Sequence, residues 1–468
     1  MTDNKTWSPT RPARLLTALA AAAVLAGCSL MPVYERPAAP VATDWPGAAP
    51  GAAPAAPLGW ADFVADPRLR ELIALSLQNN RDLRVATLNI EQVRAQYQIR
   101  QADQLPNLNL AASGNRQPAS GGGTSSSYNV GLAISSWEID FFGRIASLKE
   151  AALAQFLASE AARNAAQTSL VASVASTWLS LQANDELVGL TQRTLATRRD
   201  SLRLTRLRFD NGATSALDLR QAESLTAAAE AALAQQTRQR SLDLNALTLL
   251  VGQPLPVALV APATGEATTQ PLFRSVPAGL PSDLLTRRAD IRQAEQQLIA
   301  ANASIGAARA AFFPRIALTA GVGTASGDLS GLFQGGSWGF TLSPQALLPI
   351  FDAGRNQAGL DGAQAARAVA VAQYEKAIQS AFREVADALA GRATLGEQLR
   401  AQQAQATAEA ERFRLAELRY RNGVSSFLDV LDAQRSLFVT QQGLTQTRLA
   451  QQQNQVALYK ALGGGWSD

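Results

Sequence analysis

Two hydrophobic patterns alternate along this chain, one with the period of an α-helix and one with that of a β-strand. Between Arg68 and Leu105, apolar residues recur three or four positions apart, which predicts a helical segment with a break at Asn79-Asn80. Pro106 ends this segment, and apolar residues then alternate with polar or small ones on both sides of a Gly/Ser-rich loop at 118–127. This alternation predicts a β-hairpin over residues 107–136.

A very long helix is expected after the hairpin. No proline occurs from 119 to 253, so nothing interrupts a helix over residues 144–211, which would be ~100 Å long. A return helix is expected over residues 215–251. A Pro/Gly-rich linker at 253–281 and a single helix over 283–312 complete this part of the chain.

The same order of elements then recurs, because the chain is a duplication. Residues 419–434 match residues 208–223 at a constant offset of 211 positions, and each copy predicts a helix that stops at Asn-Gly and restarts on a Ser or Thr cap. A second ungapped match, at an offset of 208 positions, pairs Asp82-Leu83-Arg84 with Asp290-Ile291-Arg292. The predicted repeats are 67–252, with a helical tip near 211, and 282–463, with a β-hairpin over 315–346, a long helix over 355–422 and a tip near 422.

Composition narrows the classes of function. The 468 residues include no histidine, which removes the commonest general base and the commonest metal ligand. A single cysteine excludes an internal disulfide and a thiolate metal cluster. The formal net charge of +4 is too small and too evenly spread to indicate nucleic-acid binding. We therefore expect no enzymatic activity, no cofactor and no bound metal.

The N-terminus has the features of a targeting segment. In residues 1–27, Arg11 and Arg14 precede an apolar run that is too short to span a bilayer. The run ends in Leu25-Ala26-Gly27-Cys28, which resembles the lipobox of bacterial lipoproteins. By this resemblance Cys28 becomes the lipidated, palmitate-bearing first residue of the mature chain, the alternative being a chance cysteine after a cleavage site. Residues 28–66 are rich in Pro and Ala and predict an extended strap.

The four predicted strands raise a problem of closure. Each is about ten residues long, which is enough to cross a bilayer when tilted, but open sheet edges are not viable in lipid. Closure takes at least eight strands, so several chains would have to share one barrel. Two β-hairpins on a soluble protein are the alternative, and the lipobox and the aromatic residues Trp137 and Trp338 near strand ends favour the barrel.

Two other classes of lipoprotein fit less well. A lipid-anchored periplasmic adaptor should have one helical hairpin, without the duplication or the amphipathic strands. A structural coiled-coil lipoprotein would not need one long helix paired with two shorter ones. Both stay open as alternatives.

In its order of motifs, the chain resembles the TolC-like outer-membrane efflux factors, specifically their lipoprotein branch, often labelled NodT-type. The residues that carry this resemblance are the lipobox, Trp137–Arg144 and Pro349–Arg355 at the two strand-to-helix joints, and Arg419–Gln434. It implies an α+β membrane protein in which a trimeric 12-stranded β-barrel continues into a long α-helical periplasmic barrel, with two structural repeats per chain.

The function implied by the resemblance is that of the outer-membrane channel of a tripartite efflux pump. Such a channel is a passive exit duct from the periplasm to the exterior, opened by a periplasmic adaptor and driven by an inner-membrane transporter, here expected to be of the RND type. The implied partners are two further copies of the chain, the adaptor, the transporter and outer-membrane lipid.

The resemblance also implies a gate at the periplasmic tips of the helices. The implied pore-constriction residues are Leu428, Asp429 and Asp432, and the implied gating contacts between neighbouring helices are Arg419, Tyr420 and Arg435. From spacing alone, Asp429 and Asp432 share one helix face, which is either a solvated surface or a pore lining. Only the second repeat carries this pair, because the first has Asp218 and Gln221 at these positions.

Overall fold

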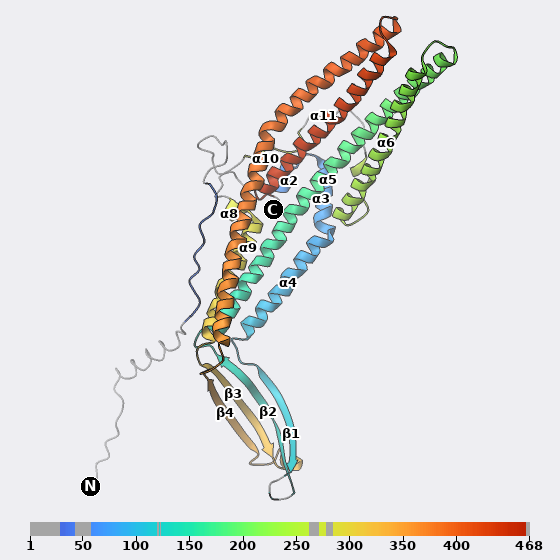
Figure 1. The fold of residues 1–468 in the computed structure, drawn as a ribbon. Helices are drawn as coiled ribbons and strands as arrows, with labels where there is room; N and C mark the ends of the chain where they lie inside the picture. The colour runs from blue at the N-terminus through green and yellow to red at the C-terminus, as the bar shows by residue number, and fades with distance from the viewer. Residues whose placement is uncertain are drawn as a thin grey trace, which may run out of the picture. The chain divides into compact units, whose positions relative to one another are not determined.

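The structure is a computed structural model that describes residues 29–42, 58–118, 121, 123–261, 271–277 and 284–464 (Figure 1). The predicted signal segment and Cys28 lie outside the described residues. The chain divides into two compact units. The sheet unit comprises Met1–Ala38, Asn89–Glu160 and Gln293–Glu375, and the helical unit comprises Ala39–Leu88, Ala161–Arg292 and Lys376–Asp468.

An antiparallel sheet of four strands dominates the sheet unit. The strands are β1 (Leu108–Pro118), β2 (Thr124–Ile139), β3 (Arg315–Ser326) and β4 (Trp338–Leu347), with a short 3-10 turn, Leu329–Gly331, between β3 and β4. They lie in the order β1-β2-β3-β4, so β2 and β3 join the two predicted hairpins into one sheet. A bulge between Ile134 and Trp137 shifts the register of β2 against β3.

The first hairpin is longer than the alternation pattern predicts. Residues 124–127 were expected in the loop, and this expectation is wrong because β2 begins at Thr124, which pairs with Pro118. The reason is that a run of serines has no hydrophobic alternation, although its backbone pairs regularly with β1. At its other end β2 continues past residue 136 to Ile139.

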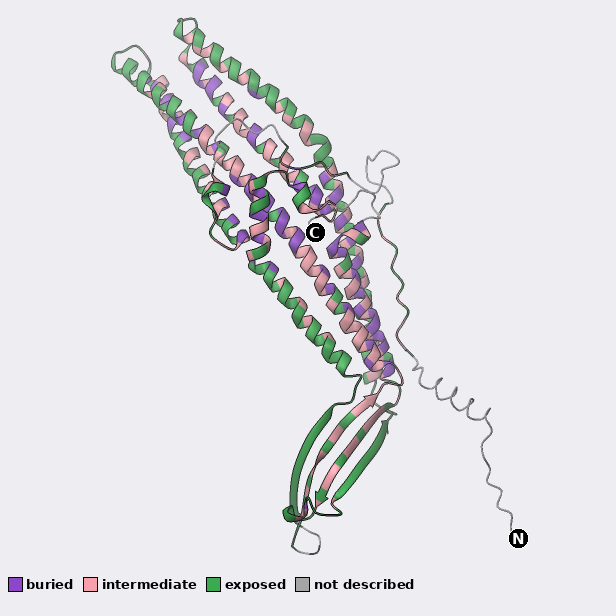
Figure 2. Ribbon diagram, turned by 180° about the vertical axis from the view of Figure 1, so that it is seen from behind, coloured by how far each residue is buried: buried purple, intermediate pink, exposed green. Residues whose placement is uncertain are grey.

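The outer strands of this sheet are open to solvent (Figure 2). Every residue of β1 and of β4 is exposed, whereas β2 and β3 are partly covered. Within the described sheet, β1 pairs only with β2 and β4 only with β3. Both edges therefore keep unpaired backbone donors and acceptors.

Four helices and residues 29–38 of the N-terminal strap complete the described part of the sheet unit. The helices are α4 (Arg81–Ala102), α5 (Arg144–Asp210), α9 (Ala289–Ala310) and α10 (Arg355–Arg421), each of which also contributes residues to the helical unit. The strap lies against α9, where Arg36 pairs with Glu295 and Arg309 donates to the carbonyl of Leu30.

The helical unit contains the main hydrophobic core. Besides parts of α4, α5, α9 and α10, it holds α2 (Trp60–Phe63), α3 (Pro67–Asn79), α6 (Ala216–Val251), α7 (Val257–Val260), α8 (Leu284–Arg287) and α11 (Phe427–Ala461). Ile73 of α3, Trp178 of α5 and Leu247 of α6 pack together, each at most 1% exposed. Phe63 stacks on Phe273 and on Tyr459, which ties α2 and α11 to the linker residues.

The long helices end within one residue of the predicted positions. α5 and α10 each have 67 residues, and the break at Asn79-Asn80 is confirmed, since the Asn80 side chain caps α4 by accepting from the N–H of Leu83 at 2.9 Å. The expectation of a single helix over 283–312 is wrong. α8 and α9 are separate because the backbone breaks at Arg288, whose side chain binds Asp290, Glu384 and the carbonyl of Ala461. None of the described helices has the length and apolar character required to cross a membrane.

Candidate functional site

The two helical tips in the helical unit have the same turn. Two residues after the ends of α5 and α10, Gly212 (φ 69°) and Gly423 (φ 71°) adopt a left-handed conformation that favours glycine. In the second tip, the N–H of Gly423 donates to the carbonyl of Tyr420 at 3.0 Å, and the N–H of Val424 donates to that of Arg419 at 2.9 Å. These bonds satisfy the last carbonyls of α10 and reverse the chain into α11.

Serine caps restart both return helices. Ser215 forms a capping box with Asp218, in which the serine hydroxyl accepts from the Asp218 N–H at 3.1 Å and the carboxylate accepts from the Ser215 N–H at 3.3 Å. Hydrogen bonds from the hydroxyls of Ser215 and Thr214 hold the pKa of Asp218 below its usual range. In the second tip, Ser426 accepts from the N–H of Asp429 at 3.4 Å. Asp429 thus lies in the first turn of α11, where a negative charge complements the helix dipole.

Asp432 is the centre of an ion-pair cluster. Arg412 of α10 donates to its carboxylate at 2.6 Å, and Arg435 of α11 donates to the other carboxylate oxygen. The hydrogen bond from Arg412, with the charge of Arg435, holds the pKa of Asp432 below its usual range. Arg412 also donates to Glu409 at 3.2 Å. Of the two predicted aspartates, Asp432 is therefore paired with two cations.

Tyr420 connects the second tip to the first. The guanidinium carbon of Arg208 lies 5.2 Å from the centre of the Tyr420 ring, and Arg208 donates a hydrogen bond to the tyrosine hydroxyl. The ring of Phe427 lies on another side of Tyr420, with 5.1 Å between ring centres. The α5–α6 and α10–α11 helix pairs, both visible in Figure 1, are thereby in contact near their tips.

In the described part of the chain, the side chains of the remaining predicted site residues make no hydrogen bond or ion pair with a separate helix. Leu428 is 50% exposed in the chain by itself. Arg419 contributes its backbone carbonyl to the turn, and the hydrogen bond of Arg435 goes to its own helix. Tyr420 and Asp432 do connect separate helices, but their partners Arg208 and Arg412 were not predicted as site residues. Arg208 had a signal, because it occupies the position of Arg419 in the first repeat, 211 positions earlier; Arg412 had none.

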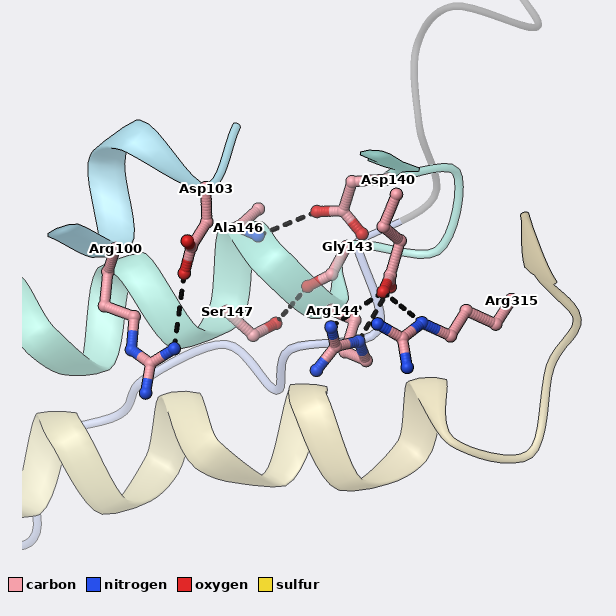
Figure 3. Close-up of polar contacts among 9 residues, drawn as sticks. Arg100, Asp103, Asp140, Gly143, Arg144, Ala146, Ser147 and Arg315 are labelled. Carbon is pink, nitrogen blue, oxygen red and sulfur yellow. Dashed lines mark hydrogen bonds and ion pairs between the residues drawn. The ribbon is translucent and has the colours of Figure 1, made fainter. Parts of the chain in front are cut away.

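A second polar cluster lies at the base of the sheet, within the sheet unit (Figure 3). The Glu138 side chain at the end of β2 is only 8% exposed and binds two cations. Arg144, the first residue of α5, donates to it at 2.7 and 2.8 Å, and Arg315, the first residue of β3, reaches it at 2.5 Å. One carboxylate therefore joins two strands and the start of a long helix.

Aspartates cap both long helices at this base. Asp140 accepts from the N–H of Ala146 at 2.7 Å, and Asp352 accepts from the N–H of Asn356 at 2.8 Å. A cavity of about 430 Å³ lies between these caps and is lined by Glu138, Arg315 and aromatic residues. In the described part of the chain, no three His, Cys, Asp or Glu side chains are grouped so that they could hold a metal ion.

Known proteins resemble the chain over nearly its whole length. The family model described as "Outer membrane efflux protein" matches residues 72–253 and 280–464. The "Probable efflux pump outer membrane protein TtgC" of Pseudomonas putida is 47% identical, covering 97% of this chain and 96% of the relative. "Outer membrane protein OprJ" of Pseudomonas aeruginosa is 46% identical, covering 98% and 97%. The crystal structure of the open state of the Neisseria gonorrhoeae MtrE outer membrane channel is 42% identical, with a TM-score of 0.85 and coverage of 94% and 99%.

Proposed function

Because this chain belongs to the outer membrane efflux protein family, we propose that it is the outer-membrane channel of a tripartite efflux pump. In this proposal it is a passive duct, without a catalytic step, through which substrates leave the periplasm. A periplasmic adaptor opens the duct, and an inner-membrane transporter of the RND type supplies the energy. The relatives named as efflux pump outer membrane proteins support this assignment over nearly the full chain.

The observation that carries the proposal is the four-stranded sheet with two open edges. In the described sheet, β1 and β4 each pair with one neighbour only, and all their residues are exposed. A sheet in lipid must close on itself, so β1 and β4 require partners from other chains. We propose a homotrimer in which three sheets form one 12-stranded barrel, and in which the long helices form the periplasmic barrel. The two separate matches to the family model support the proposed pair of repeats.

The gate is proposed at the second helical tip. Leu428, Asp429 and Asp432 would line the constriction, and contacts of Arg419, Tyr420 and Arg435 would hold it closed. The cluster around Asp432 and the contact of Tyr420 with Arg208 support a tip that is held by several polar contacts. An adaptor can shift such a tip toward the open state only if it binds that state better.

We also propose that residues 1–27 are removed and that Cys28 is acylated, which would anchor the mature chain to the outer membrane. Measurement of the intact mass of the purified chain tests this directly. The expected mass is that of residues 28–468 plus the acyl groups. An unmodified cysteine would refute the proposed anchor, but it would not contradict the proposed barrel.

The proposed channel is tested by reconstitution. The full chain, extracted from the membrane in detergent, should have the mass of a trimer by light scattering. On a denaturing gel it should run as a heat-resistant oligomer that dissociates only on strong heating, and it should form ion-conducting pores in a planar bilayer. A stable monomer that does not conduct would contradict both the trimer and the duct.

A further inference from the structure

The segment after the proposed anchor is bound to α9 through a buried carboxylate. Glu295 is 7% exposed, and its described partners come from the strap: Tyr34 donates to it at 3.1 Å, and Arg36 donates to it at 2.7 and 2.9 Å. Burial, with the charge of Glu295, raises the pKa of Tyr34 to about 12. A buried carboxylate without such donors is costly.

Two further contacts continue along the same face of α9. Asn302, which is 2% exposed, donates to the carbonyl of Pro32 at 2.8 Å, and Arg309 donates to that of Leu30 at 3.3 Å. Glu295, Asn302 and Arg309 are spaced seven residues apart, so they form one stripe along the helix. The strap therefore runs antiparallel to α9 in a fixed register.

A glycine on α9 makes room for the strap. A Cβ atom on Gly306 would lie 2.8 Å from the Cα of Met31 and 2.9 Å from its Cβ, and it would also meet the Ser147 hydroxyl. Glycine inside a helix lowers stability relative to alanine. Its presence here has a local reason, because alanine would exclude Met31 from its place.

The docked strap is contiguous with the ion-pair cluster at the base of the sheet. A Cβ atom on Gly306 would meet the Ser147 hydroxyl, which donates to the carbonyl of Gly143 at 2.6 Å (Figure 3). The next residue, Arg144, binds Glu138 at the end of β2, which also binds Arg315 at the start of β3. All these residues belong to the sheet unit.

We propose that the stripe on α9 is a docking site for the chain's own residues 30–36, and that docking of this segment orders the joint from which β2 and β3 leave. The coupling to barrel assembly rests on the proposed function; the docking site itself does not. The chemistry selects this occupant, since a buried carboxylate receives an arginine and a tyrosine while an amide and a guanidinium receive backbone carbonyls. In this proposal, docking of residues 30–36 on α9 favours assembly of the sheets into the barrel.

The test is Gly306→Ala in the full chain, with Gly359→Ala on α10 as the matched control, since a Cβ there meets nothing within 4 Å. Docking is measured as protection from chymotrypsin at Tyr34, and assembly as the fraction of heat-resistant oligomer. We expect Gly306→Ala to speed cleavage about tenfold, as for loss of one charged hydrogen bond, and to reduce the oligomer. Gly359→Ala should change neither, although both variants improve helix propensity.

Two further variants distinguish a steric conflict with the strap from one with neighbouring side chains. Ser147→Ala removes the hydroxyl that would also meet the new methyl group. If it restores full protection to Gly306→Ala, the steric conflict lies with Ser147, and the role of Gly306 in making room for the strap is overturned. Arg36→Gln should by itself speed cleavage at Tyr34. Combined with Gly306→Ala it should add little, because both act on the same docking event.

The outcomes for docking, coupling and channel are distinct. Normal protection in Gly306→Ala would overturn the docking site. Lost protection with an unchanged oligomer would overturn the coupling to assembly. Protection at Tyr34 that exists only in the oligomer and is lost on dissociation to monomers would assign the occupant to another copy of the chain, and would overturn docking within one chain. A parent chain that is protected but never conducts would count against the proposed function alone.

Discussion

Arg208 lies over the ring of Tyr420, with its guanidinium carbon 5.2 Å from the ring centre, so that an arginine of the first helical tip covers an aromatic side chain of the second. Such a contact contributes about 0.5–1 kcal/mol at an exposed site. Arg208 also donates a hydrogen bond to the Tyr420 hydroxyl, and hydrogen bonds to charged groups contribute about 1.5–3 kcal/mol. Near their tips, the α5–α6 and α10–α11 helical pairs are thus joined by a contact small enough for a partner protein to replace.

We predict that Tyr420→Leu increases the open probability of the channel in planar bilayers by roughly tenfold, because it removes both interactions with Arg208. Tyr420→Phe should have a smaller effect, since the ring remains beneath the cation. Arg206→Ser is the control, because Arg206 pairs with Glu223 within the first helical pair. Equal behaviour of Tyr420→Leu and the parent would exclude this contact from gating.

The charge of Asp432 should control ion preference over a defined pH range. Since its pKa is lowered, the folded tip favours the charged carboxylate. Its ion pairs with Arg412 and Arg435 are complete above the ordinary aspartate pKa and are lost only as the pH falls through the lowered pKa of the folded tip. We predict that cation preference in single-channel recordings is unchanged from pH 7 to about 5 and declines only below about 4.

Asp432→Asn should reproduce the low-pH behaviour at neutral pH. The substitution leaves Arg412 and Arg435 without their shared carboxylate, which makes the tip more positive, so cation preference and block by multivalent cations should weaken. Asp210→Asn, at the exposed end of α5, serves as the control for a general loss of negative charge. A parent channel that loses cation preference between pH 7 and 5 would point to a group other than Asp432.

The long elements of the fold follow from local signals, whereas the site contacts do not. α5 and α10 were predictable because no proline interrupts them and an Asn-Gly pair ends each one. The separation of α8 from α9 was missed because it depends on Arg288, which binds the distant residues Glu384 and Ala461. Arg412 and Arg208 acquire their roles only when two helices pack together. The caps at Ser215 and Ser426, in contrast, are local and agree with the prediction.

The cluster around Glu138 should stabilise the base of the sheet. We predict that Glu138→Gln lowers the free energy of unfolding by about 1–3 kcal/mol, because it removes the carboxylate that Arg144 and Arg315 share. The effect should appear as a lower temperature of dissociation of the heat-resistant oligomer. Glu91→Gln is the control, since its pair with Arg94 is exposed and should contribute little. Equal dissociation temperatures for both variants would show that the base is held by packing instead.

Two glycines face each other across the centre of the sheet. Gly131 of β2 pairs directly with Gly323 of β3, and the row continues to Ala111 of β1 and Gly339 of β4. A Cβ on Gly131 would lie 2.7 Å from the Cα of Gly323, and a Cβ on Gly323 would lie 2.5 Å from the Cα of Gly131. Real Cβ atoms do not approach so closely, so the two central strands lie closer together here than alanine would allow.

Gly323→Ala and Gly131→Ala should each cost about 1–3 kcal/mol, as for an overpacked core, and should reduce the yield of heat-resistant oligomer. Two neighbouring glycines provide matched controls. A Cβ on Gly321, two residues away on the same strand, meets only an ordinary contact at 3.6 Å, and one on Gly339 meets nothing within 4 Å. Because Gly339 lies in the same row of the sheet as Gly323, a similar loss of oligomer in Gly339→Ala would mean that any side chain in this row is harmful. A loss confined to Gly131 and Gly323 would instead show that the close approach of β2 and β3 sets the curvature needed for the sheet to assemble.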